Sequence, residues 1–378
     1  MTNPLWTFAD LVAASGGTAD GTPSAAISGF SIDTRSLSPG DVFVALKDQR
    51  DGHEFVEAAF KSGAAAALVS NSYIRRPGDG TLIRVADTLT GLQNIGRAAR
   101  ARLAPDARVI AVTGSAGKTT TKEMLRLACR ALGETHASDK SFNNHWGVPL
   151  TLARMPAATR YAVFEIGMNH AGEITPLTAM VRPDVAIVTT VGSAHIEHFG
   201  SEEAIADAKA EIFSGLRPGG TAIINLDNRH AARLAAAARA AGARITGITK
   251  DRSVSEVLAA GEVDDAVALR HCHMTSTSSE IVAERSGSRG PLAFRIGAVG
   301  MHMVMNGLIV LAALDAVGAA TPVGVAALDA FGPPPGRGSR ARLAAGDGEI
   351  LLIDESYNAN PASMRAALAV LPAIPRQS

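Results

Sequence analysis

The chain has 378 residues, which is too long for one ordinary hydrophobic core and predicts two or three domains. Lys and Arg number 36, as do Asp and Glu. This balance gives no reason to expect nucleic acid or an anionic membrane as a partner. Hydrophobic residues make up 47% of the chain and aromatic residues only 4%, which favours an α/β protein packed with Ala, Val, Leu and Ile.

Three further observations predict a cytoplasmic protein. Cys129 and Cys272 lack the spacing of a metal site and favour a reducing compartment. The first residues do not form a signal peptide, because they lack a basic region followed by an unbroken apolar run. The apolar stretch 307–330 contains two Asp and one Pro, so it predicts two core helices and not a membrane span. We also expect a monomer.

Residues 1–106 have the pattern of a separate small α/β domain. Short apolar runs predict its strands at 30–35, 41–46, 65–70 and 81–86. The polar, Pro-containing stretch 101–108 resembles a linker. We therefore expect a first domain over residues 1–106.

The most informative segment is RVIAVTGSAGKTT, residues 108–120. A β-branched run leads into a Gly-rich turn and then into a helical pattern, which is the layout of a phosphate-binding loop. Lys118 would supply a cation for the β- and γ-phosphates, and Thr119 a hydroxyl for Mg²⁺. The longer form of this motif has Gly where Val112 stands, so only the short form is present. The alternative is a Gly-rich turn with a chance Lys. The nucleotide contacts expected here are Gly114, Ser115, Ala116, Gly117, Lys118, Thr119 and Thr120.

Two more segments suggest binding chemistry before residue 170. The loop 141–151 carries Asn143 and Asn144, whose amides suit sugars and diphosphates but also suit simple turns. Glu165 ends a buried strand, where a carboxylate can hold Mg²⁺ opposite the phosphate loop. The alternative for Glu165 is a strand-end side chain that simply reaches solvent.

His195 and Lys209 follow in chain order. His195 lies in the loop after the strand VAIVTTV, where it could bind a metal or remain an ordinary surface residue. Lys209 falls on the same helical stripe as Ile205 and Ile212. Its stem could pack there with the charged head in solvent. Alternatively, burial could lower its pKa, so that the neutral amine adds CO₂ and becomes a carbamate ligand for Mg²⁺.

The central region, residues 107–332, predicts a largely parallel sheet with helices on both faces. Four strand-length apolar runs in this region, and a fifth that begins at residue 349, each end in polar or Gly-rich residues, and ligands bind beyond the carboxyl ends of such strands. Residues 252–300 alternate polar and apolar positions and predict a small antiparallel excursion. His302 and Asn306 lie four residues apart at a helix start, where they could contact an adenine or cap the helix.

The segment GPPPGRG, residues 332–338, predicts a stiff hinge. After it we expect one strand at 350–354, a loop and one helix at 361–371. One strand and one helix cannot bury a core. Residues 333–378 are therefore expected to be the beginning of an incomplete third domain.

Taken in order, these segments resemble the Mur ligase family. The resemblance covers nearly the whole chain and rests on SIDTRSLSPGDVFVALKDQRDGHEF, TGSAGKTTTKEM, NNHWGVPLT, EIGMNHAGEI and DESYNANP. It implies a uridine-nucleotide-binding first domain, a central ATPase domain and a Rossmann-like third domain that binds a dipeptide. The substrate contacts that it implies in the first domain are Asp33, Thr34, Arg35, Asp51, Gly52 and His53.

The resemblance also implies a reaction. It points to an ATP-dependent, ADP-forming amide ligase that joins D-alanyl-D-alanine to UDP-N-acetylmuramoyl-tripeptide for peptidoglycan synthesis. Glu165 and His195 would bind Mg²⁺, and Lys209 would be carbamoylated. Arg337 and Asp354 would reach the ATP. With an incomplete third domain we expect retained binding of the UDP-substrate, weak nucleotide binding and strongly reduced ligation.

Other functions stay open at this point. A sister ligase could add a different amino acid, and a folylpolyglutamate synthase would lack the first-domain motifs. A P-loop ATPase or GTPase could act as a protein-binding switch, although no guanine-specificity motif is evident. A non-catalytic module could keep the nucleotide–sugar site without turnover. Binding of UMP or UDP would separate the family from the folate enzymes.

Overall fold

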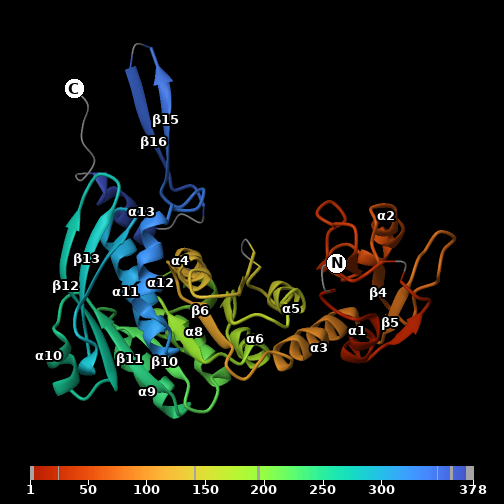
Figure 1. The fold of residues 1–378 in the computed structure, drawn as a ribbon, viewed down its shortest axis with the longest axis horizontal. Helices are drawn as coiled ribbons and strands as arrows, with labels where there is room; N and C mark the ends of the chain where they lie inside the picture. The colour runs from red at the N-terminus through yellow and green to blue at the C-terminus, as the bar shows by residue number, and fades with distance from the viewer. Residues whose placement is uncertain are drawn as a thin grey trace. The chain divides into compact units, whose positions relative to one another are not determined.

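The computed structural model describes residues 4–23, 25–139, 142–193, 196–346, 348–357 and 361–371. Its contacts divide the chain into two compact units, shown in Figure 1. The first unit holds Met1–Ala107 and Ser138–Arg160, and the second holds Arg108–Ala137 and Tyr161–Ser378. Residues 138–160 thus pack with the N-terminal unit, although the expected division placed them in the central domain. The boundaries of a three-domain division stay a prediction.

The first unit is built on a five-stranded sheet in the order β1-β5-β4-β3-β2. All neighbouring strands are parallel except β1, which pairs antiparallel with β5. The strands are β1 (Thr18–Asp20), β2 (Gly29–Ser31), β3 (Asp41–Val44), β4 (Ala66–Ser70) and β5 (Leu82–Val85). The helices are α1 (Phe8–Ser15), η1 (Gly52–Phe55), α2 (Val56–Lys61), α3 (Thr88–Ala101) and α5 (Gly147–Ala153). The four strands expected from the sequence are β2 to β5.

Helix α5 joins this unit by close packing on α3. A Cβ atom placed on Gly96 of α3 would lie 3.2 Å from Leu152 Cβ, so the two helices approach at a small residue. The indole of Trp6 donates to Ala153 O at 3.0 Å, and the guanidinium of Arg102 lies 3.7 Å from the centre of the Trp6 ring. These contacts hold residues far apart in the sequence in one unit.

The second unit contains a nine-stranded sheet in the order β14-β13-β12-β11-β10-β9-β6-β8-β7. Strands β6 to β12 are parallel, and β13 and β14 continue the sheet antiparallel. This confirms the predicted parallel sheet with an antiparallel excursion. The strands are β6 (Arg108–Thr113), β7 (Thr135–Ala137), β8 (Tyr161–Glu165), β9 (Val185–Val188), β10 (Thr221–Asn225), β11 (Arg244–Thr249), β12 (Asp265–Met274), β13 (Ser279–Arg285) and β14 (Leu292–Ile296).

Helices cover this sheet and close its core. Helix α11 is buried on nearly every side because its sequence is almost entirely apolar, and it packs between the sheet, α4 and α12 (Figure 1). Full burial of each Leu or Ile there contributes about 1.5–3 kcal/mol. The helices are α4 (Lys118–Arg130), α6 (Ile174–Val181), α7 (Ile196–Phe199), α8 (Glu202–Ala210), η2 (Glu211–Gly215), α9 (Ala231–Ala240), α10 (Val254–Ala259), η3 (Gly287–Arg289), α11 (Met301–Ala316), α12 (Thr321–Ala326), η4 (Ala327–Ala330) and α13 (Pro361–Leu368).

The two core helices expected within 307–330 correspond to α11 and α12. Among the described residues, no helix combines the length and the apolar character needed to cross a bilayer.

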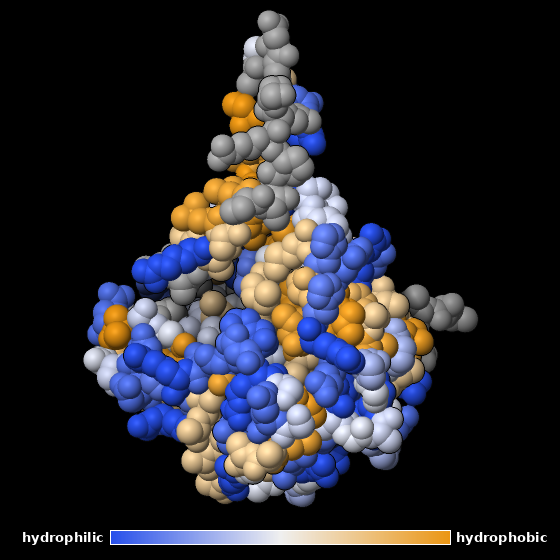
Figure 2. Space-filling model, turned by 90° about the vertical axis from the view of Figure 1, so that its left-hand side faces the viewer, coloured by the Kyte–Doolittle hydropathy of each residue, from blue (hydrophilic) through white to orange (hydrophobic). Residues whose placement is uncertain are grey.

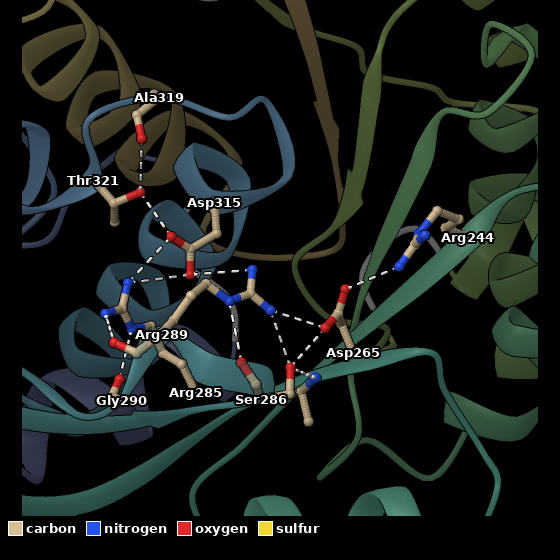
Figure 3. Close-up of polar contacts among 10 residues, drawn as sticks. Arg244, Asp265, Arg285, Ser286, Arg289, Gly290, Asp315, Ala319 and Thr321 are labelled. Carbon is tan, nitrogen blue, oxygen red and sulfur yellow. Dashed lines mark hydrogen bonds and ion pairs between the residues drawn. The ribbon is translucent and has the colours of Figure 1, made fainter.

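A buried network of charges joins the antiparallel strands to the end of α11 (Figure 3). The Arg285 guanidinium lies 3.2 Å from the Asp315 carboxylate, and both side chains are less than a tenth exposed. Arg289 contacts Asp315 at 3.6 Å and Asp265 at 2.8 Å. Thr321, the first residue of α12, donates to Asp315 at 2.7 Å. Each buried cation here has an acidic partner, as a buried ion pair requires.

The prediction for the last segment was wrong in one respect. Residues 339–354 form an antiparallel hairpin of β15 (Ser339–Ala345) and β16 (Gly348–Asp354), which belongs to neither large sheet. The expected strand at 350–354 is β16, but β15 was missed and the pairing is not parallel. The hairpin extends away from the body of the second unit (Figure 1). Figure 2 shows apolar side chains on it, and Leu343, Ile350 and Leu352 are about half exposed.

Candidate active site

The predicted phosphate loop connects β6 to α4, at the carboxyl end of the parallel strands. Gly114 and Gly117 have φ values of +148° and +83°, which favour glycine. A Cβ atom on Gly114 would lie 2.0 Å from Thr189 Oγ1. The loop therefore needs Gly114 for its backbone conformation and for its close approach to the neighbouring strand. Its location at a helix N-terminus suits an anion.

Lys118 begins α4 and bends back over the loop. Its Nζ donates to Gly114 O at 2.7 Å. Burial lowers the pKa of Lys118, Glu165 opposes that shift, and Arg337 adds to it. Two cations therefore lie close together at the loop, where phosphate groups would bring opposite charge.

Thr119 and Glu165 meet beside Lys118, as the sequence predicted. Thr119 Oγ1 donates to Glu165 Oε2 at 2.8 Å, and Glu165 is 1% exposed at the end of β8. A hydroxyl and a carboxylate are the hard oxygen ligands that Mg²⁺ prefers, so this pair fits a magnesium ion. Within the described ranges, no three His, Cys, Asp or Glu side chains gather into a metal cluster. A magnesium ion here would therefore need oxygens from a bound phosphate as well.

Lys209 lies in the last turn of α8 and is 2% exposed. Burial, together with the nearby Lys118, lowers the pKa of Lys209 to about 7. The alternative in which its charged head reaches solvent is thus excluded. A lysine with this pKa is substantially uncharged at neutral pH, which is the form that reacts with CO₂.

The segment Thr189–Gly192, which follows β9, is bonded to the phosphate loop at several points. Ser115 N donates to Thr190 O at 2.8 Å, and Ser115 Oγ pairs with the backbone of Gly192 at 3.0 Å. Thr189 Oγ1 donates to Ala116 O at 2.5 Å. Sequence reasoning missed these partners, because nothing in the spacing shows which strand lies beside the loop. His195, three residues further on, lies outside the described residues.

Asn306 and His302 lie on the first turns of α11, beside the loop. A Cβ atom on Gly117 would lie 3.0 Å from Asn306 Oδ1, so the Asn306 amide faces the loop. Burial lowers the pKa of His302, which favours the neutral ring. Thr120, also expected at the nucleotide, is 6% exposed within α4.

A pocket opens next to His302, between α11 and the hairpin. Its walls are mostly apolar, with a few polar groups, and are formed by Thr277, Gly297, Ala298, Val299, His302, Met303, Pro333, Gly338, Arg340, Ile353, Glu355, Ala367 and Val370.

The hinge before the hairpin contains Arg337 and is organised by Asp354. Asp354 Oδ2 accepts from Gly336 N at 3.1 Å, and Oδ1 accepts from Ser356 N at 3.0 Å and Ser356 Oγ at 2.6 Å. The Arg337 guanidinium lies 4.6 Å from the centre of the Tyr357 ring. The charge of Arg337 acts on Lys118, and both carboxylate oxygens of Asp354 are bonded within the hinge. Contact of Arg337 and Asp354 with ATP stays a prediction.

The candidate uridine-binding residues lie in the first unit, beyond the carboxyl ends of β2 and β3. Asp33 accepts from Arg35 in a two-pronged ion pair, with the closest contact at 2.7 Å. Thr34 lies between them and is half-buried. Arg35 is exposed, and its pairing with Asp33 raises its pKa. This short turn therefore places the charged groups of Asp33 and Arg35 beyond the end of β2.

Asp51, Gly52 and His53 form the second part of that candidate site. Ser70 N donates to His53 Nε2 at 2.9 Å, so Nδ1 carries the proton and donates to Asp51 Oδ1 at 2.6 Å. A Cβ on Gly52 would lie 2.4 Å from Leu46 O. Both nitrogens of His53 are therefore occupied within the protein, and His53 shapes the loop.

Asn143 and Asn144 precede α5. Asn144 Oδ1 accepts from Trp146 N at 3.2 Å and Gly147 N at 2.9 Å, which is the turn chemistry that the sequence left open. Asn143 is half-buried.

The Mur ligase middle domain profile matches residues 112–314. A UDP-N-acetylmuramoyl-tripeptide–D-alanyl-D-alanine ligase from Bacillus subtilis is 36% identical over 351 residues, which cover 90% of this chain and 69% of that relative. The Escherichia coli protein of the same name is 37% identical over 344 residues, which cover 91% of this chain and 71% of that relative.

Among solved structures, MurF from Acinetobacter baumannii superposes with a TM-score of 0.82 at 31% identity, covering 98% of this chain and 77% of that protein. The chain belongs to the Mur ligase family. This confirms the resemblance and the fold class predicted from the sequence. The matched region contains the phosphate loop, Glu165 and Lys209, so the buried polar groups described above lie within the part that defines a Mur ligase.

Proposed function

We propose that this chain joins D-alanyl-D-alanine to UDP-N-acetylmuramoyl-tripeptide at the expense of ATP, which becomes ADP and phosphate. The observation that carries the proposal is the grouping of Lys118, Lys209 and the Thr119–Glu165 pair beside the phosphate loop. Buried cations at a helix N-terminus favour a polyphosphate. The names of the 36% and 37% identical relatives support the choice of the two substrates.

The chemistry needs an activated carboxylate, because a free carboxylate is a poor electrophile. An oxygen of the tripeptide's terminal carboxylate attacks the γ-phosphorus, the bond to ADP breaks, and an acyl phosphate forms. The uncharged amine of D-alanyl-D-alanine then attacks the acyl carbon, and phosphate leaves. Lys118 offsets the charge that develops on the transferred phosphoryl group.

Thr119 and Glu165 are the described residues that would hold Mg²⁺, with His195 as a further candidate ligand. The ion would neutralise phosphate charge and act as a Lewis acid on the phosphoryl oxygens. A carbamate on Lys209 would convert a buried amine into an oxygen ligand for a second ion. The pKa of about 7 supports this, since the uncharged amine is available near neutral pH.

The pocket beside His302 is the proposed position of the adenine. Its apolar walls suit a nucleobase, and it is lined by His302, which lies on the same helix as Asn306, the residue that faces the phosphate loop. In the first unit, the loops around Asp33 and Asp51 would bind the uridine nucleotide. We further propose that the enzyme works in the cytoplasm, where both ATP and UDP-linked precursors occur.

The proposal is tested by following phosphate release and peptide product together. The chain would receive ATP, Mg²⁺, bicarbonate and UDP-N-acetylmuramoyl-tripeptide, with and without D-alanyl-D-alanine. Phosphate release that depends on the dipeptide, with pentapeptide as product, is the expected result, at the strongly reduced rate expected of an incomplete third domain. Turnover with a single amino acid in place of the dipeptide would indicate a sister ligase. Tight binding of the UDP-substrate with no turnover would indicate a binding module.

A further inference from the structure

The turn that follows β10 contacts the Thr189–Gly192 segment of the candidate active site. Asn228 Nδ2 donates to Val191 O at 2.7 Å and to Thr190 Oγ1 at 3.0 Å. Asn228 Oδ1 accepts from His230 N at 2.9 Å. Because the oxygen meets a backbone N–H, the amide has one orientation that satisfies all three contacts. The NH₂ group therefore faces the Thr189–Gly192 segment.

That segment is the same one that holds the phosphate loop. Thr190 O accepts from Ser115 N at 2.8 Å, and Gly192 pairs with Ser115 Oγ at 3.0 Å. A continuous series of hydrogen bonds thus leads from Asn228 through Thr190 and Val191 to Ser115. Asn228 is far from the loop in sequence. It ends TAIINLDN, one of the runs whose polar ends were expected near the ligand, but it was not itself a candidate site residue.

The other side of the turn contacts α8, the helix that carries Lys209. Arg229 lies 2.6 Å from the Glu202 carboxylate in the first turn of α8. His230 is 5% exposed and lies 3.4 Å from the same carboxylate. The turn is therefore bonded both to the segment beside the phosphate loop and to the helix that carries the buried lysine.

We infer that Asn228 is a positioning residue that fixes the phosphate loop for phosphoryl transfer, through Thr190 and Val191. The inference rests on the proposed function. Loss of the Asn228 donor leaves Val191 O without this partner and frees the segment that Ser115 is bonded to. Because small displacements of groups around reacting atoms lower rates strongly, we expect a loss of kcat of about tenfold or more.

The test uses Asn228→Asp and Asn228→Ser, with Asn225→Ser as the matched control. The Asp variant keeps the size of the side chain and an acceptor for His230 N but replaces the donor that faces Val191 O. Asn225 is the last residue of β10, directly before this turn, and its Oδ1 accepts from Asp227 N at 3.0 Å. The measurements are kcat, the KM values for ATP and for UDP-N-acetylmuramoyl-tripeptide, the affinity for Mg²⁺ with a non-hydrolysable ATP analogue, and the unfolding midpoint.

Both Asn228 variants should lose kcat and bind the ATP analogue several-fold more weakly, with the KM for the UDP-substrate unchanged. The Asn225 variant should keep all of these values. An Asn228→Asp variant that turns over and binds the analogue like the unsubstituted chain would overturn the inference, as would equal losses in Asn225→Ser.

The two proposals fail in different ways. If the unsubstituted chain binds the analogue but makes no product, the proposed function fails, and the affinities of the variants still decide the role of Asn228. If it binds no nucleotide at all, both proposals are overturned.

Discussion

The second unit contains two groups of buried charges that are built in opposite ways. At the junction of β13 and α11, Arg285 forms an ion pair with Asp315, and the Asp315 carboxylate also accepts a hydrogen bond from Thr321. Beside the phosphate loop, burial lowers the pKa of Lys118, and burial together with the nearby Lys118 lowers the pKa of Lys209; among the described residues no acid raises the pKa of Lys209. The first group is complete within the protein. In the second, Glu165 is the acid that acts on Lys118, while Arg337 opposes its effect, so the group favours an anionic partner.

The sharpest way to break the second group is to remove its principal cation. Lys118→Ala should lower kcat by at least ~10²–10³-fold, because the charge on the transferred phosphoryl group loses its partner. The unfolding midpoint should not fall, since a cation whose charged form is disfavoured by burial adds little stability. Coupled phosphate and product assays check this. Lys250→Ala removes a lysine paired with an exposed acid and serves as the control.

Lys209 tests whether the second group needs a carbamate and not a positive charge. Lys209→Arg keeps the cation but cannot form a carbamate, so turnover should fall by about 10²-fold. In the unsubstituted protein, ¹³C-labelled bicarbonate should give a carbamate signal by NMR, and this signal should be absent from the variant. Equal turnover of the two proteins would contradict the proposed role of Lys209.

Removing the acid from the first group should cost stability and leave chemistry intact. Asp315→Ala leaves Arg285 buried without its main partner, which should lower the free energy of unfolding by about 3–5 kcal/mol. The double variant Arg285→Met, Asp315→Leu should recover most of this loss, because no unpaired charge remains. Denaturant unfolding measures both, and kcat per folded molecule should stay constant. A stable Asp315→Ala protein would show that the network of Figure 3 contributes little.

The pH dependence of stability should also separate the groups. The pKa of Lys209 falls from 10.5 to about 7 on folding, so the unfolded chain binds more protons between these values. Lys209 therefore destabilises the fold by its full amount below pH 7. This destabilisation decreases as the pH rises from 7 towards 10.5. Compared with Lys209→Met, the unsubstituted protein should be less stable at pH 6.5, and the difference should shrink by pH 9.5. Thermal unfolding at both pH values gives the answer.

The smallest effect is expected at an exposed ion pair. Arg295 and Asp329 lie on the surface at the edge of the antiparallel strands, with about half of each side chain exposed. Water and salt screen such a pair. Arg295→Gln should therefore leave the unfolding midpoint unchanged within measurement error, in contrast to Asp315→Ala. A drop of the same size in both variants would show that burial is not what distinguishes the network.

The sequence predicted correctly those features of the second unit that depend on neighbouring residues. The Gly-rich turn lies between an apolar strand and a helix, and Glu165 lies buried at a strand end, as the sequence indicated; their roles in binding stay predictions. Lys209 was placed correctly because an apolar stripe continues on both sides of it. These predictions succeed because each depends on residues that are near one another in the chain.

The parts that could not be predicted depend on which distant segments meet. Spacing alone does not show that Thr189 and Thr190 lie against the loop, or that Asn228 supports them from another strand. Strand β15 was missed because its residues carry two arginines and follow a Pro/Gly-rich hinge, so they have only a weak apolar alternation. Nor does spacing show that Ser70 and Asp51 bond to the two ring nitrogens of His53, whose contact with a substrate stays a prediction.

The hinge has a mechanical consequence. Asp354 at the end of β16 is bonded to Gly336, and Gly338 N donates to Asp354 O at 2.8 Å, so the residues on both sides of Arg337 are tied to the hairpin. A rotation of the hairpin would carry the Arg337 guanidinium with it as one rigid piece. Because Arg337 lowers the pKa of Lys118, such a rotation would change the electric potential at the phosphate loop. The orientation of the hairpin would therefore alter the pKa of Lys118.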